Sequence, residues 1–219
     1  MNFFNRWFEK TGDVLFPRSC VACKKEGALL CSTCFANWNT THLSSEDLKG
    51  GDIGKQFWTF AYADPIAREL ICSWKYYFDA TAWSILQAKI LPSFSNFREV
   101  IRSERIEAFI PVPLHDQRFC ERGFDQAETL ARFLAQELGC ACRPLLVRER
   151  NTGKQAERTP EERCVSMQEN PFSALPFSVP KNLILIDDVW TTGSTASAAA
   201  SALRARGAEK IFIYTIAKG

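Results

Sequence analysis

Two adjacent carboxylates, Asp187 and Asp188, stand between an apolar run and a segment of small hydroxyl residues. The apolar run Leu183–Ile186 is typical of a buried parallel strand, and Thr191–Thr195 (TTGST) leads into an Ala-rich segment with helical character. Ligands bind at the carboxyl edge of parallel sheets. A helix N-terminus offers N–H groups and a positive dipole to an anion, and Gly193 would let the backbone approach it closely. The stretch therefore predicts an anion site flanked by two acids.

Other interpretations of this stretch exist. A purely structural one makes the acids helix caps and TTGST an ordinary turn, but neighbouring carboxylates repel each other and favour cationic or hydroxyl partners. The G-x-x-x-x-G-K-[ST] loop of Walker-type nucleotide hydrolases is absent from the sequence, and so is the G-x-G-x-x-G of dinucleotide folds. We therefore favour a ligand site without excluding the structural role.

A second chemical feature is a pair of C-x-x-C motifs, at Cys20/Cys23 and Cys31/Cys34. Each motif places two thiolates on one side of a tight turn, and two such turns complete a tetrahedral metal site. Thiolates select zinc or an iron–sulfur centre. A thioredoxin-type or disulfide role is the alternative, but neither motif sits in a βαβ pattern. We expect structural zinc. The scattered cysteines are expected to be small apolar core residues: Cys72, Cys120, Cys140, Cys142 and Cys164.

The elements that position these residues follow an alternating pattern. Strands are predicted over 57–64, 106–115, 143–150, 182–187 and 210–217, and helices over 65–78, 81–94, 124–139 and 194–208. Such alternation with apolar strands predicts an α/β fold with a parallel sheet covered on both faces. We expect two domains: an N-terminal helix with a four-cysteine zinc module over 1–50, and the α/β domain over 51–219. The polar stretch 39–56 is expected to be a linker or edge loop, and 151–172 a mobile loop with a helical piece.

Composition narrows the class of protein. Of the 219 residues, 46% are hydrophobic and 24% charged, and the formal net charge is +2, so no general attraction to nucleic acid or membrane is expected. No apolar run is long enough to span a bilayer, and residues 1–16 lack the pattern of a signal peptide. Reduced thiols and this pattern favour the cytoplasm.

The stretch LILIDDVWTTGST (183–195) resembles the thirteen-residue motif with which type I phosphoribosyltransferases bind phosphoribosyl diphosphate (PRPP). By that resemblance, Asp187 and Asp188 hold the ribose hydroxyls and act as the catalytic acids. The 5′-phosphate is bound by the loop residues Thr191, Thr192, Gly193, Ser194 and Thr195. Hydroxyls donate to carboxylates and phosphates accept from N–H groups, so these assignments are chemically consistent.

Further segments resemble the ComF/GntX family, in which a four-cysteine zinc finger precedes a type I phosphoribosyltransferase-like domain. They are YADPIARELICSWKYYFD (62–79), IPVPLHDQRFCERGFDQAETLA (110–131) and RERNTGKQAERTPEER (148–163). Asp125 stands where the family usually has Asn, Cys164 where Asn is common, and Trp190 is bulkier than usual. These departures leave the fold unchanged and leave the second substrate pocket undefined.

The resemblance also implies a place for the diphosphate. The turn after the strand at 106–115 is the candidate diphosphate loop, and the segment around Arg150 is a candidate lid. Half of the basic residues are expected to be ordinary surface charges, and His115 as a base is no better supported than His115 as a packing residue. The candidates for the loop and lid are Val112, Pro113, Leu114, His115, Arg118, Arg122, Lys75, Lys154, Gln155 and Arg163.

Three functions remain open from the sequence. The first is a ComFC-like competence protein that binds PRPP with Mg²⁺ and handles single-stranded DNA, beside a membrane channel and a helicase-like ATPase, in the cytoplasm or at the inner face of the membrane. The second is an active phosphoribosyltransferase of nucleotide salvage or other metabolism. The third is a PRPP-sensing adaptor without turnover. No segment names an acceptor base, and the fold alone does not decide between them.

Overall fold

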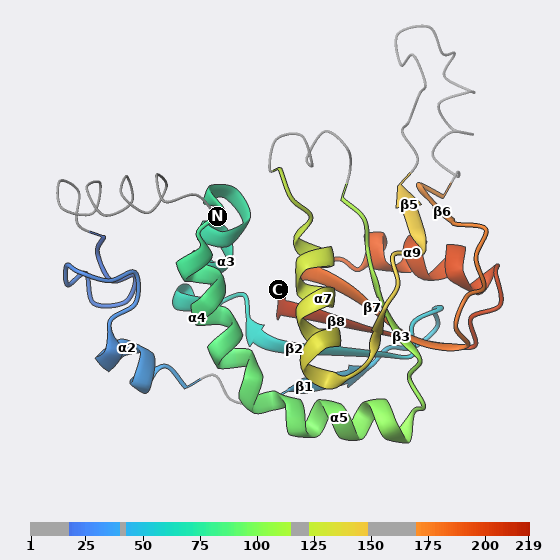
Figure 1. Cartoon of the computed structure of the whole chain (residues 1–219), viewed down its shortest axis with the longest axis horizontal. Coiled ribbons are helices and arrows are strands. Elements are labelled where there is room, and N and C mark those ends of the chain that lie inside the picture. The colour runs from blue at the N-terminus through green and yellow to red at the C-terminus, as the bar shows by residue number, and fades with distance from the viewer. Residues whose placement is uncertain (1–17, 40–42, 115–122, 149–169) are drawn as a thin grey trace, which may run out of the picture. The chain divides into compact units, whose positions relative to one another are not determined.

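The computed structural model describes residues 18–39, 43–114, 123–148 and 170–219 (Figure 1). The chain divides into two compact units. We call residues 1–42 with 60–92 the cysteine unit, and residues 43–59 with 93–219 the sheet unit. The predicted division into domains over 1–50 and 51–219 stays a prediction. The expected N-terminal helix and the expected loop over 151–172 lie wholly or almost wholly outside the described residues.

The sheet unit is built on a six-stranded sheet of order β1-β2-β8-β7-β3-β4. The pairs β7–β8, β3–β7 and β3–β4 are parallel, and β1 adds an antiparallel edge next to β2. This confirms the predicted α/β fold with a mostly parallel sheet. The strands are β1 Ser44–Asp47, β2 Lys55–Ala61, β3 Ala108–Pro111, β4 Ala141–Cys142, β7 Asn182–Trp190 and β8 Lys210–Lys218. A separate antiparallel ribbon pairs β5 Leu146–Arg148 with β6 Phe172–Ala174.

Helices cover the sheet, and their apolar faces explain where each packs. Helix α7 (Gln126–Leu138) lies in front of the strands in Figure 1. Helix α9 (Ser194–Arg204) presents alanines to a core that includes Leu183 and Leu185 of β7. Helix α5 (Phe94–Ser103) inserts Phe97 into an aromatic layer, where its ring lies 5.2 Å from that of Tyr214. The small side chains of α9 let it approach β7 closely, which fixes the start of α9 next to the end of that strand.

Several sequence predictions can be compared with these elements. The helix predicted over 124–139 is α7, and Gly139 ends it with φ +68. The expected linker contains the edge strand β1 instead, and α5 was not predicted. The strand predicted to stop at Asp187 runs on to Trp190, so the two acids lie within β7 and not beyond it. Side chains of successive strand residues alternate between the faces, so Asp187 and Asp188 point to opposite sides of the sheet.

The cysteine unit combines a short helix α2 (Ser32–Asn37) with a helical hairpin of α3 (Pro65–Tyr77) and α4 (Ala80–Ile90), followed by one 3-10 turn, η1 (Leu91–Ser93). Trp74 and Trp83 stack across the hairpin with ring centroids 4.4 Å apart. Pro65 stands in the first turn of α3, where its missing N–H costs nothing. Among the described residues, no helix is long and apolar enough to cross a membrane.

Candidate anion site and cysteine cluster

The predicted anion loop lies at the start of α9 and is held by a glycine in a left-handed conformation. Gly193 is the N-cap of α9 with φ +76 and has no side chain of its own to cap the helix. The Ser194 N–H donates to Thr192 Oγ1 at 3.4 Å, so the first N–H groups of α9 lie at the loop. A Cβ on Gly193 would lie 2.4 Å from the Trp190 ring, so the indole packs directly against this residue. The hydroxyls of Thr192 and Ser194 form a hydrogen bond of 3.0 Å. The loop therefore offers backbone and hydroxyl donors around one point, as an anion requires.

A cavity of about 40 Å³ lies in this loop. One buried water needs roughly 10–15 Å³, so this cavity is larger than the space that a single water requires. Asp187 is the acid that lines it, together with Val189–Ala196, and Asp188 does not. The structure thus brings Asp187 and Thr191–Thr195 together and leaves Asp188 on the other face. The backbone N–H of Asp188 donates to Asp187 Oδ1 at 2.8 Å.

The candidate diphosphate loop begins at the same edge of the sheet. Strands β3 and β7 are parallel with Pro111 opposite Ile186, and the Val112 N–H continues the pairing to the Ile186 carbonyl at 2.9 Å. Both strands therefore deliver the residues that follow to one edge, which carries Val112–Leu114 from β3 beside the acids of β7. The role of Val112–Leu114 as a diphosphate loop stays a prediction.

Asp125 fixes this loop and was not singled out as a site residue by the sequence. Its Oδ1 accepts from the Glu128 N–H at 3.0 Å and caps α7, while its Oδ2 accepts from the Leu114 N–H at 2.9 Å. Burial raises the pKa of the Asp125 carboxyl, although these N–H donors oppose the shift. The signal available in the sequence was an Asp before an amphipathic helix, which predicts a cap but not the second hydrogen bond.

Other candidates are not placed against this edge. Lys75 belongs to α3 in the cysteine unit. The remaining loop and lid candidates lie outside the described residues: His115, Arg118, Arg122, Lys154, Gln155 and Arg163.

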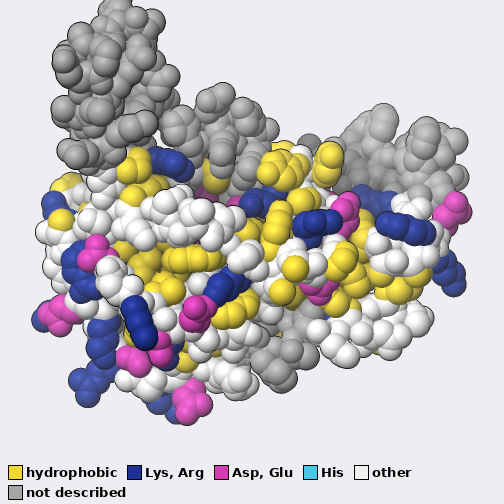
Figure 2. All heavy atoms as spheres, turned by 180° about the vertical axis from the view of Figure 1, so that it is seen from behind, with side chains coloured by type: hydrophobic (Ala, Val, Ile, Leu, Met, Phe, Trp, Pro, Cys, Tyr) yellow, Lys and Arg dark blue, Asp and Glu magenta, His cyan; other side chains and the backbone are white. Residues whose placement is uncertain are grey.

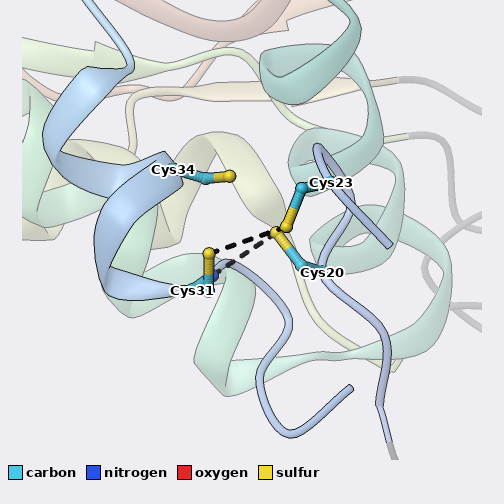
Figure 3. Close-up of side chains that lie close together, drawn as sticks. All are labelled: Cys20, Cys23, Cys31 and Cys34. Carbon is cyan, nitrogen blue, oxygen red and sulfur yellow. Dashed lines mark hydrogen bonds between the residues drawn. The ribbon is translucent and has the colours of Figure 1, made fainter. Parts of the chain in front are cut away.

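The four clustered cysteines converge as the sequence predicts (Figure 3). The sulfur atoms of Cys20, Cys23, Cys31 and Cys34 all lie within 4.8 Å of one another, and those of Cys23 and Cys31 are 3.8 Å apart. Zinc–sulfur bonds of about 2.3 Å in a tetrahedron place sulfurs roughly 3.8 Å apart. Cys20 and Cys23 come from a loop, Cys31 is the N-cap residue of α2 and Cys34 lies inside that helix. The arrangement fits a tetrahedral metal ion.

Electrostatics within the cluster also favour a cation. Burial raises the pKa of the Cys20 thiol, but backbone N–H groups outweigh it and lower that pKa to about 6. Hydrogen bonds with Cys31 and Cys23 raise the pKa of Cys34 to about 12. Four thiolates this close repel one another, so they ionise together only with a cation between them.

Two aspartates that cap the helices α3 and α4 also bind residues on either side of the four cysteines in the sequence. Asp64 Oδ1 caps α3, and Asp64 Oδ2 accepts from Trp38 Nε1 at 2.7 Å. Asp79 caps α4 in the same way and pairs with Arg18 at 2.8 Å. The Lys89 ammonium donates to the Trp38 carbonyl at 2.7 Å and lies over the Phe35 ring. An Asp directly before each helix is the signal that the sequence offers for these caps, and it does not predict the second partners.

Comparison with known proteins adds a family to this geometry. The family model for a phosphoribosyl transferase domain matches residues 125–219. Competence protein F of Haemophilus influenzae is 35% identical over 51% of this chain and 50% of its own length, and competence protein ComFC of Bacillus subtilis is 31% identical over 68% and 57%. The DNA utilization protein YhgH of Salmonella typhi is 30% identical over 51% and 49%. The chain thus spans about half the length of the curated relatives that it matches.

The matched region contains α7, β7, the anion loop, α9 and β8, which are the elements that build the candidate site. The cysteine cluster precedes it in the chain. The relatives named competence protein F and ComFC, together with the phosphoribosyl transferase domain, support a ComF-like family for this chain.

Proposed function

We propose that this chain is a PRPP-binding, phosphoribosyltransferase-like protein of the ComF type that acts in natural competence, in the uptake or processing of single-stranded DNA. The observation that carries the ligand is the cavity shared by Asp187 and Thr191–Thr195 at the edge reached by Val112–Leu114. The names of the relatives, competence and DNA utilization proteins, support the process.

The chemistry of the edge assigns a part of PRPP to each segment. The 5′-phosphate accepts from the N–H groups and hydroxyls of Thr191–Thr195, which line the cavity of about 40 Å³. Asp187 accepts from a ribose hydroxyl, and Asp188 is the next residue of β7, on the other face of the sheet. The diphosphate lies along Val112–Leu114. Bound Mg²⁺ would neutralise charge on that diphosphate.

Binding is tested by titrating PRPP with Mg²⁺ in a calorimeter. Asp187→Asn keeps the size of the side chain and removes its charge, so we expect PRPP affinity to fall by roughly tenfold or more, the loss of a charged hydrogen bond. Asp47→Asn is the matched control, because Asp47 is an exposed acid paired with Lys55 on an edge strand. Wild-type protein that binds no PRPP, or equal affinity in both variants, would contradict the proposal.

The DNA partner is supported by an aromatic cluster at the end of α3, which we define as Tyr76, Tyr77 and Phe78. These side chains are 56%, 79% and 49% exposed, and Lys75 precedes them. Bases stack on exposed aromatic rings, each worth about 1–3 kcal/mol. On the face drawn in Figure 2, Lys and Arg are interspersed with Asp and Glu, so the described residues there form no continuous basic stripe. We therefore propose that the aromatic cluster contributes to DNA binding by stacking on the bases.

Fluorescence anisotropy with a labelled oligothymidylate tests this surface. We expect Tyr76→Ala/Tyr77→Ala to weaken binding of single-stranded DNA by about tenfold or more, given the stacking energy above. Phe177→Ala removes another exposed aromatic residue, 58% exposed and in the sheet unit, and is expected to leave binding unchanged. Equal loss in both variants would show that the aromatic cluster has no special role.

A second candidate function is transfer itself, because the matched family model describes a transferase domain. Release of diphosphate from PRPP over a panel of bases separates an active transferase from a protein that only binds PRPP. We expect PRPP binding without base-dependent release, as in a sensing adaptor. Release that requires one base and is lost in Asp187→Asn would establish the transferase instead.

The metal and the location complete the proposal. We propose one structural Zn²⁺ on Cys20, Cys23, Cys31 and Cys34, because all four positions of a tetrahedron are then filled and no open position remains for catalysis. The protein acts in the cytoplasm, at the inner face of the membrane beside a helicase-like ATPase. Elemental analysis of purified protein should find one zinc per chain, and iron in its place would overturn the metal assignment.

A further inference from the structure

A buried hydroxyl in β8 has no hydrogen-bond partner among the residues that the structure describes. Thr215 is 0% exposed, and its Oγ1 makes no hydrogen bond within this part of the chain. Leaving such a group unsatisfied destabilises a fold by about 1–3 kcal/mol, and Val would fill the same space without that cost. The neighbours of Thr215 along the strand, Tyr214 and Ile216, are buried as well. The Thr215 hydroxyl therefore does not stabilise the fold, and its presence needs another explanation.

The register between β7 and β8 places this hydroxyl next to the proposed ribose acid. Leu183 lies opposite Ile211, Leu185 opposite Ile213 and Asp187 opposite Thr215. Opposed residues of paired strands share a face, and the first two pairs belong to the core beneath α9. The pair of Asp187 and Thr215 is thus the first in which both strands change from apolar to polar. This change occurs where the core meets the anion loop.

The Asp187 carboxylate accepts a hydrogen bond from its own strand, and a donor from β8 would restrict its orientation further. Its Oδ1 accepts from the Asp188 N–H at 2.8 Å, a bond within the same strand. A donor from β8 would fix the plane of the carboxylate from the side. The ribose hydroxyls would then meet an acceptor with one orientation. Because it turns on ribose binding at Asp187, this inference rests on the proposed function.

We propose that Thr215 is a positioning residue that donates a hydrogen bond from its Oγ1 to the Asp187 carboxylate when the ribose of a sugar phosphate is bound. The cost of the unsatisfied hydroxyl in the ligand-free protein is recovered on binding. Gln56 also holds a buried side-chain amide without a partner among the described residues, but its neighbour on the edge strand β1 is Glu46, which does not line the anion loop.

The test compares side chains that differ by the hydroxyl alone. Thr215→Val keeps the shape, and Thr215→Ser and Thr215→Ala form a second matched pair in which both lack the methyl group. Calorimetric titration uses three probes: PRPP with Mg²⁺, ribose 5-phosphate and inorganic phosphate. We expect Val and Ala to weaken binding of both ribose ligands about tenfold relative to wild type and Ser, as for loss of a hydrogen bond to a charged group. Inorganic phosphate, which needs only the loop, should bind all four proteins equally.

Thermal unfolding separates positioning from folding. Thr215→Val should melt at the wild-type temperature or above it, because an unsatisfied hydroxyl has been removed. Equal affinity of the Ser and Ala variants for ribose 5-phosphate, or an equal loss of inorganic phosphate binding, would overturn the inference. Failure of the proposed function looks different, since wild-type protein would then not bind PRPP and Asp187→Asn would change nothing.

Discussion

Position 193 sets two constraints that only glycine meets among the amino acids. Its φ of +76 is left-handed, and Trp190 occupies the space where a Cβ would lie. We expect Gly193→Ala to lower the free energy of unfolding by about 1–2 kcal/mol from the backbone alone, with further loss from the clash. Because the loop must shift, PRPP affinity should fall as well. Chemical denaturation and calorimetry measure the two effects.

Gly139 provides the control for this prediction. Its φ is +68, similar to that of Gly193, but nothing lies within 4 Å of a Cβ added there. Gly139→Ala should show the backbone cost and leave PRPP binding at the wild-type level. Equal binding in both variants would mean that the geometry of the Gly193 loop does not matter to the ligand.

The raised pKa of Asp125 predicts that the stability of the protein depends on pH. Burial raises its pKa in the folded state above the unfolded value of about 3.9, so its ionisation costs stability. The contribution of Asp125 to stability is therefore fully present below the unfolded pKa and is lost as pH rises through the folded pKa. Denaturation from pH 3 to pH 7 should therefore show Asp125→Asn gaining stability relative to wild type as pH rises. A constant difference over that range would contradict the assignment of the shift to Asp125.

Removal of the Asp125 carboxylate should also affect the ligand site. Asp125→Ala loses the cap of α7 and releases the Leu114 N–H, so we expect about 1 kcal/mol lower stability and weaker PRPP binding. Asp79→Ala removes an equivalent cap in the cysteine unit. It should lower stability without weakening PRPP binding, and a similar loss of affinity in both variants would count against the loop.

Among the elements, Asp64 links helix α3 to the segment that carries the cysteine cluster. Asp64 caps α3 and binds the indole N–H of the buried Trp38. Asp64→Ala should therefore cost more than an ordinary cap, by about 1–3 kcal/mol for the unsatisfied N–H. A double-mutant cycle with Trp38→Phe measures the coupling. Additive effects of the two substitutions would show that the bond contributes nothing.

The elements show what could be predicted from sequence and what could not. Helix α7 was predictable because its apolar spacing, Asp125 and Gly139 all agree. Helix α5 was missed because Pro92 indicated an end, although Phe94, Phe97, Val100 and Ile101 follow it at helical spacing. Of these residues, Phe94 and Phe97 are the buried ones. The anion loop and the cysteine cluster were predictable because their chemistry is local. The double roles of Asp64, Asp79 and Asp125, and the pairing of Thr215 with Asp187, depend on partners far away in the chain.

At the scale of the whole molecule, the two units predict separate responses to metal removal. The cysteine cluster lies in one unit, and the anion loop lies in the other, which has its own core. Hydrogen exchange with a chelator present should show loss of protection in residues 18–39 and unchanged protection in β7 and β8. PRPP binding should persist. Cys34→Ser, which removes one ligand, should reproduce the effect without chelator, and loss of protection in β7 would contradict this independence.

A crystal structure of the protein with PRPP and Mg²⁺ would show whether the edge formed by β3, β7 and the start of α9 binds PRPP. We expect the 5′-phosphate within hydrogen-bond distance of the N–H groups of Thr191–Thr195. A ribose hydroxyl should lie on Asp187, whose carboxylate Thr215 then contacts. A complex with the phosphate bound elsewhere, or crystals grown at saturating PRPP with this loop empty, would contradict the account.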